Sequence, residues 1–297
     1  MKKNKNFIVS VAVFSLFSVG TVSAELAVLP RIQAGIINYD ISLTEPGEAL
    51  NITEGVNVDI SNNQSSNGLS DSILMLGAGL TLAQGNYFAD VYYQQSASGE
   101  LSNSGLSRGS IVPENIGVDR DDFALSLGRS FGDFVVGFGY KSSETEFDQN
   151  FTILSDDVRV NANLSSSFKL DGPFVSFAYG RGIGPGVLSA KIAIADLTGD
   201  WDINQVNLES GADLATDVSG DATGITFGLV WKAPINDQWS YSISADYYDY
   251  DFDVSGTRAN FTNANGQQQQ IGGSTVVENV NLTEEVSSLN FALIYTF

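Results

Sequence analysis

The sequence predicts an all-β protein: a single closed antiparallel up-and-down transmembrane β-barrel of about ten strands, with long outer loops and short periplasmic turns. Segments with apolar side chains at every second position recur along the chain, as expected for strands that have one apolar face. The connections between these segments alternate between short turns and long polar stretches, which is typical of transmembrane barrels. After the N-terminal region, no stretch has the roughly 20 consecutive apolar residues that a spanning helix needs.

The N-terminal region has the features of a secretory signal peptide. Lys2, Lys3 and Lys5 form a basic start, residues 7–19 form a short apolar run, and 22–24 are small residues suited to cleavage. The run is too short to span a membrane as a helix. We therefore expect a signal peptide over 1–24 and an outer-membrane barrel domain over 25–297. A soluble periplasmic or secreted β-protein is the alternative.

The charge balance excludes one class of partner. The chain has 14 Lys and Arg residues against 35 Asp and Glu residues. Nucleic-acid binding needs a basic surface, so it is not expected. Cysteine is absent, which excludes disulfides and thiolate metal sites.

Ten alternating segments are expected to form the wall. Four of their connections are short and carry the Gly, Asn, Asp and Pro residues of tight turns: 84–86, 132–133, 182–186 and 233–237. The other five are long, and an even strand count places both termini on the periplasmic side. Eight or twelve strands remain compatible with the pattern. The ten expected strands are 31–42, 70–83, 87–97, 121–131, 134–145, 168–181, 187–197, 221–232, 238–250 and 285–297.

One phase of each strand is apolar and is expected to face lipid. Phe123, Leu125 and Leu127 share this phase, as do Phe227 and Leu229. In the first strand, Ile36 and Ile37 are adjacent, so either phase is possible. Aromatic residues also gather beside the short connections, where amphipathic rings favour the membrane interface. The expected periplasmic aromatic girdle consists of Tyr87, Phe131, Phe134, Trp231, Trp239 and Phe297.

The opposite phase is rich in Gly, Ala and Ser. These residues leave a narrow lumen or make room for large inward side chains, for which Phe88, Tyr92, Gln94 and Tyr248 are the candidates. A plugged barrel and a narrow pore both fit, because ten strands lie between a filled barrel and a wide channel. Four charged residues also have the inward phase. They form either a salt-bridge network or a constriction that selects solutes by charge: Asp90, Lys141, Lys191 and Asp246.

The predicted outer loops are acidic. Asp119, Asp121 and Asp122 end one of them. Asp196, Asp200 and Asp202 are a weak candidate for a calcium site, since Ca²⁺ takes oxygen ligands. Divalent ions could also bridge these carboxylates to lipopolysaccharide. A solvated acidic surface that resists aggregation explains the same residues.

The C-terminal segment carries a resemblance to a known group. Leu289, Phe291, Leu293, Tyr295 and Phe297 are apolar at alternate positions, and the sequence stops on Phe297. This closing strand resembles that of small bacterial outer-membrane β-barrels of the broad porin-like family. The resemblance implies the outer membrane of a Gram-negative bacterium, recognition of this strand by the barrel assembly machinery, and contacts with membrane lipid and lipopolysaccharide. We further expect a monomer, with no cofactor apart from possible loop-bound calcium.

Enzymatic activity is not expected. Many membrane hydrolases use a histidine as base, and this chain has none. It is similar to the omptin proteases in length and expected strand count, but their catalytic histidine has no counterpart here. We expect a narrow passive channel for ions or small solutes with an acidic, cation-favouring mouth. The alternatives are a surface interaction protein or adhesin with acidic loops and a closed lumen, and a structural barrel that supports the envelope.

Overall fold

A computed structural model describes most of the chain. The described residues are 26–44, 50–53, 56–58, 67–97, 99–101, 111–155, 158–207, 212–264 and 267–297. The expected signal peptide at 1–24 lies outside them. In this part of the chain, no helix has the length and apolar character to cross a membrane.

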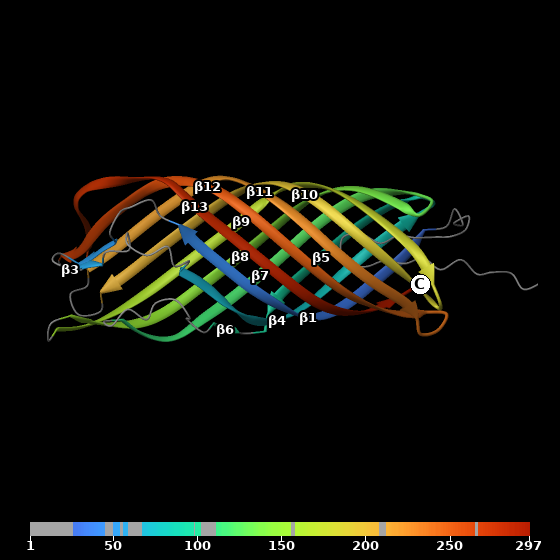
Figure 1. Cartoon of the computed structure of the whole chain (residues 1–297), viewed down its shortest axis with the longest axis horizontal. Coiled ribbons are helices and arrows are strands. Elements are labelled where there is room, and N and C mark those ends of the chain that lie inside the picture. The colour runs from blue at the N-terminus through green and yellow to red at the C-terminus, as the bar shows by residue number, and fades with distance from the viewer. Residues whose placement is uncertain are drawn as a thin grey trace, which may run out of the picture.

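Ten long strands form the wall of a closed barrel (Figure 1). Each neighbour pair is antiparallel, and β1 pairs with β13, while β5 pairs with β7. Three short strands, β2 (Leu50–Thr53), β3 (Val56–Val58) and β6 (Gly99–Leu101), add a hairpin and a short extension. The ten are β1 (Ala27–Thr44), β4 (Asn67–Gln84), β5 (Tyr87–Ser96), β7 (Ile111–Phe131), β8 (Phe134–Ser155), β9 (Val158–Ile183), β10 (Gly186–Asn207), β11 (Ala212–Pro234), β12 (Trp239–Ala264) and β13 (Gln267–Tyr295).

The expected strand count and order are confirmed, because the ladder closes with ten strands and leaves no place for eight or twelve. Most strands are longer than expected. Strand β9 begins at Val158, ten residues before the expected wall segment 168–181, and β13 begins at Gln267. The early parts of these strands lie outside the apolar band, where no lipid imposes apolar alternation. The short turns are also present, and Gly85, Gly132 and Gly184 have positive φ in three of them.

An apolar band surrounds the short-turn half of the barrel. The outward residues of this half are exposed, for example Leu127 on β7, Phe138 on β8 and Leu229 on β11. On β1, Ile36 is outward and 51% exposed, whereas Ile37 is inward and 2% exposed, which fixes the phase that the sequence left open. Both ends of the described chain lie at the short-turn end, where Phe297 donates its backbone N–H to the carbonyl of Val28.

Small inward residues make room for large ones across the lumen. A Cβ atom added to Gly224 would lie 2.3 Å from the Tyr250 ring, and one added to Gly128 would lie 2.3 Å from the Phe88 ring. The flat guanidinium of Arg31 lies in the same way against Gly79. The inward glycines therefore permit dense packing and do not widen the lumen.

Beyond the apolar band, the barrel interior is filled with aromatic and aliphatic side chains. Tyr39 of β1 packs on Phe147 of β8 with ring centroids 6.0 Å apart. Phe168 of β9 packs on Phe252 of β12 at 5.1 Å. Neither pair joins neighbouring strands, so these side chains meet across the lumen. The extramembrane part of the barrel thus has a hydrophobic core.

Replacing Gly224 should destabilise the barrel through this packing. The Gly224→Ala methyl group would overlap the Tyr250 ring, and overpacking of this kind costs about 1–3 kcal/mol. We expect a lower urea midpoint for the variant refolded in lipid vesicles. Gly117→Ala is the matched control, because its Cβ would meet only the Asp148 carbonyl oxygen at 3.7 Å. Equal midpoints for the two variants would contradict the packing argument.

Candidate functional site

The lumen within the apolar band contains a polar network, and Arg31 and Asp90 form its periplasmic end. Arg31 Nη1 and Nη2 donate to the two carboxylate oxygens of Asp90 at 2.6 and 2.9 Å. Thr81 bonds both partners. Both charged side chains are almost completely buried. The bidentate geometry gives a strong, directional ion pair, and it joins β1 to β5 across the intervening β4.

A chain of amides leads from this level to a second cation. Gln33 Nε2 donates to Gln94 Oε1 at 2.8 Å, and Gln94 Nε2 donates to Asp122 Oδ2 at 2.8 Å. Arg120 contacts Asp122 at 3.1 Å and Glu284 at 2.6 Å. Arg120 and Glu284 belong to β7 and β13, which are separated in the wall by β5, β4 and β1. Their ion pair therefore crosses the lumen as a tie between opposite walls.

Lys141 and Lys191 complete the network. Lys191 forms an ion pair with Asp246 at 2.7 Å. Lys141 extends from β8 and donates a hydrogen bond to the Tyr250 hydroxyl on β12. Its ammonium lies 4.4 Å from the Tyr250 ring centroid and 5.4 Å from that of Tyr248. Within the described residues, no ion pair joins Lys141 to a carboxylate.

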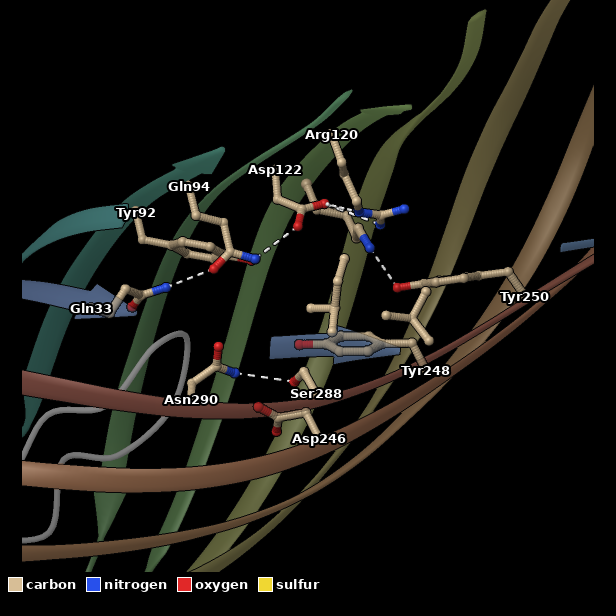
Figure 2. Close-up of a pocket in the computed structure, with 13 residues that line it drawn as sticks. Gln33, Tyr92, Gln94, Arg120, Asp122, Asp246, Tyr248, Tyr250, Ser288 and Asn290 are labelled. Atoms are coloured by element: carbon tan, nitrogen blue, oxygen red, sulfur yellow. Dashed lines mark hydrogen bonds and ion pairs between the residues drawn. The ribbon is translucent and has the colours of Figure 1, made fainter. Parts of the chain in front are cut away.

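A small cavity lies between these groups (Figure 2). Tyr92 and Gln94 approach it from one wall, and Tyr248 and Tyr250 approach it from another. The space open to the centres of water molecules is about 30 Å³. Since one water needs roughly 10–15 Å³ by this measure, the cavity has the scale of water or a small ion. Asn290 and Ser288, which hydrogen-bond each other at 3.1 Å, add polar oxygens to its lining.

The four lumenal charges expected from the sequence all face the lumen: Asp90, Lys141, Lys191 and Asp246. Sequence reasoning missed several others. Asp122 was assigned to the acidic end of a loop, although it is the second residue of the expected strand 121–131, and in the structure it is 9% exposed inside the barrel. The two-residue alternation is continuous along this strand, so positions 120, 122, 124, 126 and 128 share one face. This continuity could have assigned Asp122 to the lumen. The missed lumenal charges are Arg31, Arg120, Asp122, Lys232 and Glu284.

The lumenal charges are nearly balanced. Among the side chains that the structure describes, each carboxylate of the lumen has a cation within ion-pair distance. The carboxylates of the network are thus compensated, as buried charges must be, and the described inward cations slightly outnumber them. The inward cations are Arg31, Arg120, Lys141, Lys191 and Lys232, and the inward carboxylates are Asp90, Asp122, Asp246 and Glu284.

The residues of the expected aromatic girdle lie at the short-turn end. Trp239, Tyr295 and Phe297 form a chain of edge-to-face contacts with centroid distances of 5.0 and 4.7 Å. Arg129 packs its guanidinium over the rings of Tyr87 and Phe131 at 5.0 and 4.8 Å. Of the six girdle residues, Trp231 alone is partly buried, and the others are exposed: Tyr87, Phe131, Phe134, Trp239 and Phe297.

The candidate calcium ligands lie on the extramembrane wall. Asp196, Asp200 and Asp202 are exposed along one face of β10. In the part of the chain that the structure describes, no three carboxylates gather in a way that could hold a metal. A calcium site here stays a prediction from the sequence.

Facing pairs of like charge run around this wall. Residues directly opposite on neighbouring strands share a face, and several such pairs are two carboxylates. Like charges in this arrangement are destabilising. Lys169 is the one outward cation among the described side chains of this wall. The facing pairs are Asp119–Glu146, Asp121–Glu144, Asp202–Asp217, Asp221–Asp253 and Asp249–Glu285.

Comparison with solved structures supports the fold. No protein-family model matches the sequence, and no curated protein matches it. The outer-membrane protease OmpT from Escherichia coli is similar in structure, with a TM-score of 0.65, 9% identity, and coverage of 91% of this chain and 97% of OmpT. This chain has the fold of a bacterial outer-membrane β-barrel. Together with the closed ladder and the exposed apolar band, this fold places the protein in the bacterial outer membrane.

Two other solved barrels align with lower scores. The translocator domain of the autotransporter NalP from Neisseria meningitidis has a TM-score of 0.45 and 10% identity, with 93% of this chain and 90% of that chain covered. A Pseudomonas aeruginosa FadL homologue has a TM-score of 0.36 and 7% identity, with 90% of each chain covered.

Breaking the Arg31–Asp90 pair should strongly destabilise this outer-membrane barrel. Asp90→Asn leaves the buried Arg31 charge without its carboxylate, and removal of one partner of a buried pair costs about 3–5 kcal/mol. The expected result is a lower urea midpoint in lipid vesicles.

Lys169→Gln supplies the comparison for an exposed pair. Lys169 and Asp171 are 3.4 Å apart, with side chains 48% and 28% exposed, and exposed pairs contribute within about 1 kcal/mol. If Asp90→Asn unfolds at the same midpoint as Lys169→Gln, the network does not stabilise the barrel.

Relieving a facing carboxylate pair should have the opposite effect. Asp217 lies directly opposite Asp202, so Asp217→Asn removes a like-charge repulsion. We expect a higher unfolding midpoint at low ionic strength and a difference from wild type that shrinks as added salt screens the charges. A midpoint unchanged at every salt concentration would show that the repulsion has no effect on stability.

Proposed function

We propose that this outer-membrane barrel has a closed lumen and acts as a surface interaction protein, with its extramembrane wall and loops as the binding region. The observation that carries the proposal is the length and filling of the wall. About 9–11 residues of a strand suffice to cross the membrane, whereas β9, β12 and β13 have 26, 26 and 29 residues.

The packing inside the extramembrane part of the barrel favours a binding role and disfavours a channel. The contacts of Tyr39 with Phe147 and of Phe168 with Phe252 fill the interior where a channel mouth would need open space. Below them, the Arg120–Glu284 tie crosses the lumen. A filled cylinder holds the side chains of the extramembrane wall at defined positions, which favours binding by lowering the cost of ordering them.

The charge of the wall indicates the kind of partner. The facing carboxylate pairs persist although they oppose stability, and such a field attracts basic partners. We therefore propose a cationic protein or peptide surface as partner. Contacts with lipopolysaccharide through divalent cations, recognition of the C-terminal strand by the assembly machinery and a monomeric state also belong to the proposal.

The proposed function does not include catalysis. The chain contains neither histidine nor cysteine, so a base or nucleophile of these types is absent from the sequence itself. The carboxylates of the lumen are engaged by Arg31, Arg120 and Lys191.

A narrow passive channel for ions or small solutes is the second candidate. The specific observation in its favour is the polar network with its water-sized cavity. Opening it requires the cross-lumen tie and the aromatic layer above it to move. The acidic wall would then act as a cation-favouring mouth.

Conductance separates the two candidates. We expect the refolded protein to give no steps in a planar bilayer across a salt gradient, with folding verified by a gel shift on boiling. Reproducible steps with cation preference would overturn the closed lumen and support the channel.

The binding region is tested by surface display in a non-adherent Gram-negative strain. We expect displayed wild-type protein to increase attachment to cultured epithelial cells and to oligolysine-coated beads. The combined replacement of Asp200, Asp202, Asp217 and Asp221 by Asn should reduce attachment several-fold, most strongly at low salt.

Asp133→Asn with Asp237→Asn is the control for position in the barrel, with two replacements instead of four. It makes the same chemical change in periplasmic turns at the other end of the barrel, and attachment should persist. Equal attachment by cells displaying the wild type and the four-residue Asp→Asn variant, or no attachment by cells displaying the wild type, would overturn the interaction proposal.

A further inference from the structure

The ammonium of Lys141 is held in the manner of a bound ligand. Lys141 belongs to β8, and the residues that hold its ammonium belong to β12, with β9, β10 and β11 between them in the wall. The side chain crosses the lumen and ends at Tyr250, to whose hydroxyl it donates a hydrogen bond. Of the other buried cations, Arg31, Arg120 and Lys191 are paired with carboxylates instead.

Two tyrosine rings form the receiving surface. Tyr248 and Tyr250 are successive inward residues of β12, and their rings stack with centroids 6.2 Å apart and an interplanar angle of 19°. The Lys141 Nζ atom lies 5.4 and 4.4 Å from these centroids. The electron-rich faces of aromatic rings recognise ammonium groups in this geometry, and ammonium ligands are bound by such aromatic surfaces.

The remaining lining of the cavity adds oxygen atoms and a third aromatic ring. Asp122 and Asp246, which are ion-paired with Arg120 and Lys191, contribute carboxylates, and Tyr92 contributes its ring from the opposite wall (Figure 2). Arg120 also lines the cavity. Amide and hydroxyl oxygens come from Asn290 and Ser288. The space of about 30 Å³ admits water but no second large group. Lys141 therefore reaches into a small chamber whose aromatic rings and oxygen atoms can contact a monovalent cation.

We propose that this tyrosine-lined chamber is a binding site for a small alkylammonium cation, and that the ammonium of Lys141 is its tethered occupant. In the native chain the tether fills the site and keeps other small cations out of the lumen. Once the tether is shortened, a free alkylammonium ion of matching size binds in its place. The site lies inside the barrel, so the proposal is independent of any extracellular partner.

Chemical rescue of Lys141→Ala tests the site. The side-chain atoms that this substitution deletes correspond to n-propylammonium, which is the probe. We expect the variant refolded in lipid vesicles to unfold at a lower midpoint than wild type. Added n-propylammonium should raise its midpoint in a saturable manner, because a ligand that binds only the folded state stabilises it. Wild type should show no saturable shift, because its site is filled.

Two comparisons make the result specific. n-Propanol has the same size without the charge, and it should leave the variant's midpoint unchanged if the tyrosine faces and carboxylates select a cation. Lys141→Met fills the volume without a charge, and n-propylammonium should not shift it. Equal shifts with n-propanol, or a saturable shift in wild type, would overturn the proposal, as would no shift in Lys141→Ala.

The test holds even if Lys141→Ala does not fold alone. Refolding is then carried out with n-propylammonium or n-propanol present, and the folded fraction is measured by its migration on gels without boiling. The proposal expects n-propylammonium to restore the folded band and n-propanol to leave it absent. Failure of n-propylammonium to restore folding would overturn it.

Discussion

The pairing of β1 with β13 is the constraint on which the rest of the structure depends. In a hydrocarbon environment every backbone N–H and C=O group needs a partner within the protein, and a sheet achieves this only when its two edges meet. The ladder from Arg31–Ile294 to Thr44–Asn281 joins those edges. Closure with ten strands then sets the width of the lumen. Inward side chains must fill this width, while outward side chains must match either lipid or water.

The filling follows from that width. A lumen of this size is too narrow to be a wide aqueous pore, and it is too wide to be filled by small side chains alone. The structure combines both sizes, placing Gly224 against Tyr250 and Gly128 against Phe88. Charged inward side chains also need partners. The buried guanidinium of Arg31 is compensated by Asp90, which accepts two hydrogen bonds from it in bidentate geometry. The interior is therefore close to neutral, whereas the outer wall is left acidic where water solvates it.

Much of the fold could be predicted from the sequence because the decisive signal is local. Alternation along one strand determines which residues face lipid, and it correctly placed Asp90 and Lys141 in the lumen. It failed where the local signal ended. Because Ile36 and Ile37 are adjacent, the phase of β1 stayed open, and the inward position of Arg31 could not be predicted. The acidic run from Asp119 to Asp122 was interpreted as the end of a loop. The partner of each charge could not be predicted at all. Whether Arg120 meets Glu284 depends on the stagger and tilt of the whole closed sheet, which no single strand encodes.

The Arg120–Glu284 tie also has a consequence for the order of assembly. Its two residues are 164 positions apart in the chain, and they meet only when the last strand has joined the first. Until then Arg120 has only its local contact with Asp122 and Glu284 lacks this cation, so the loss of water from the lumen and the closure of the sheet are expected as one late event. Contacts between such distant segments form slowly, because the chain entropy of a long loop is lost before the contact contributes. An unclosed intermediate would therefore keep a wet, charged interior, and this disfavours premature burial in the membrane of a barrel that lacks its final strand.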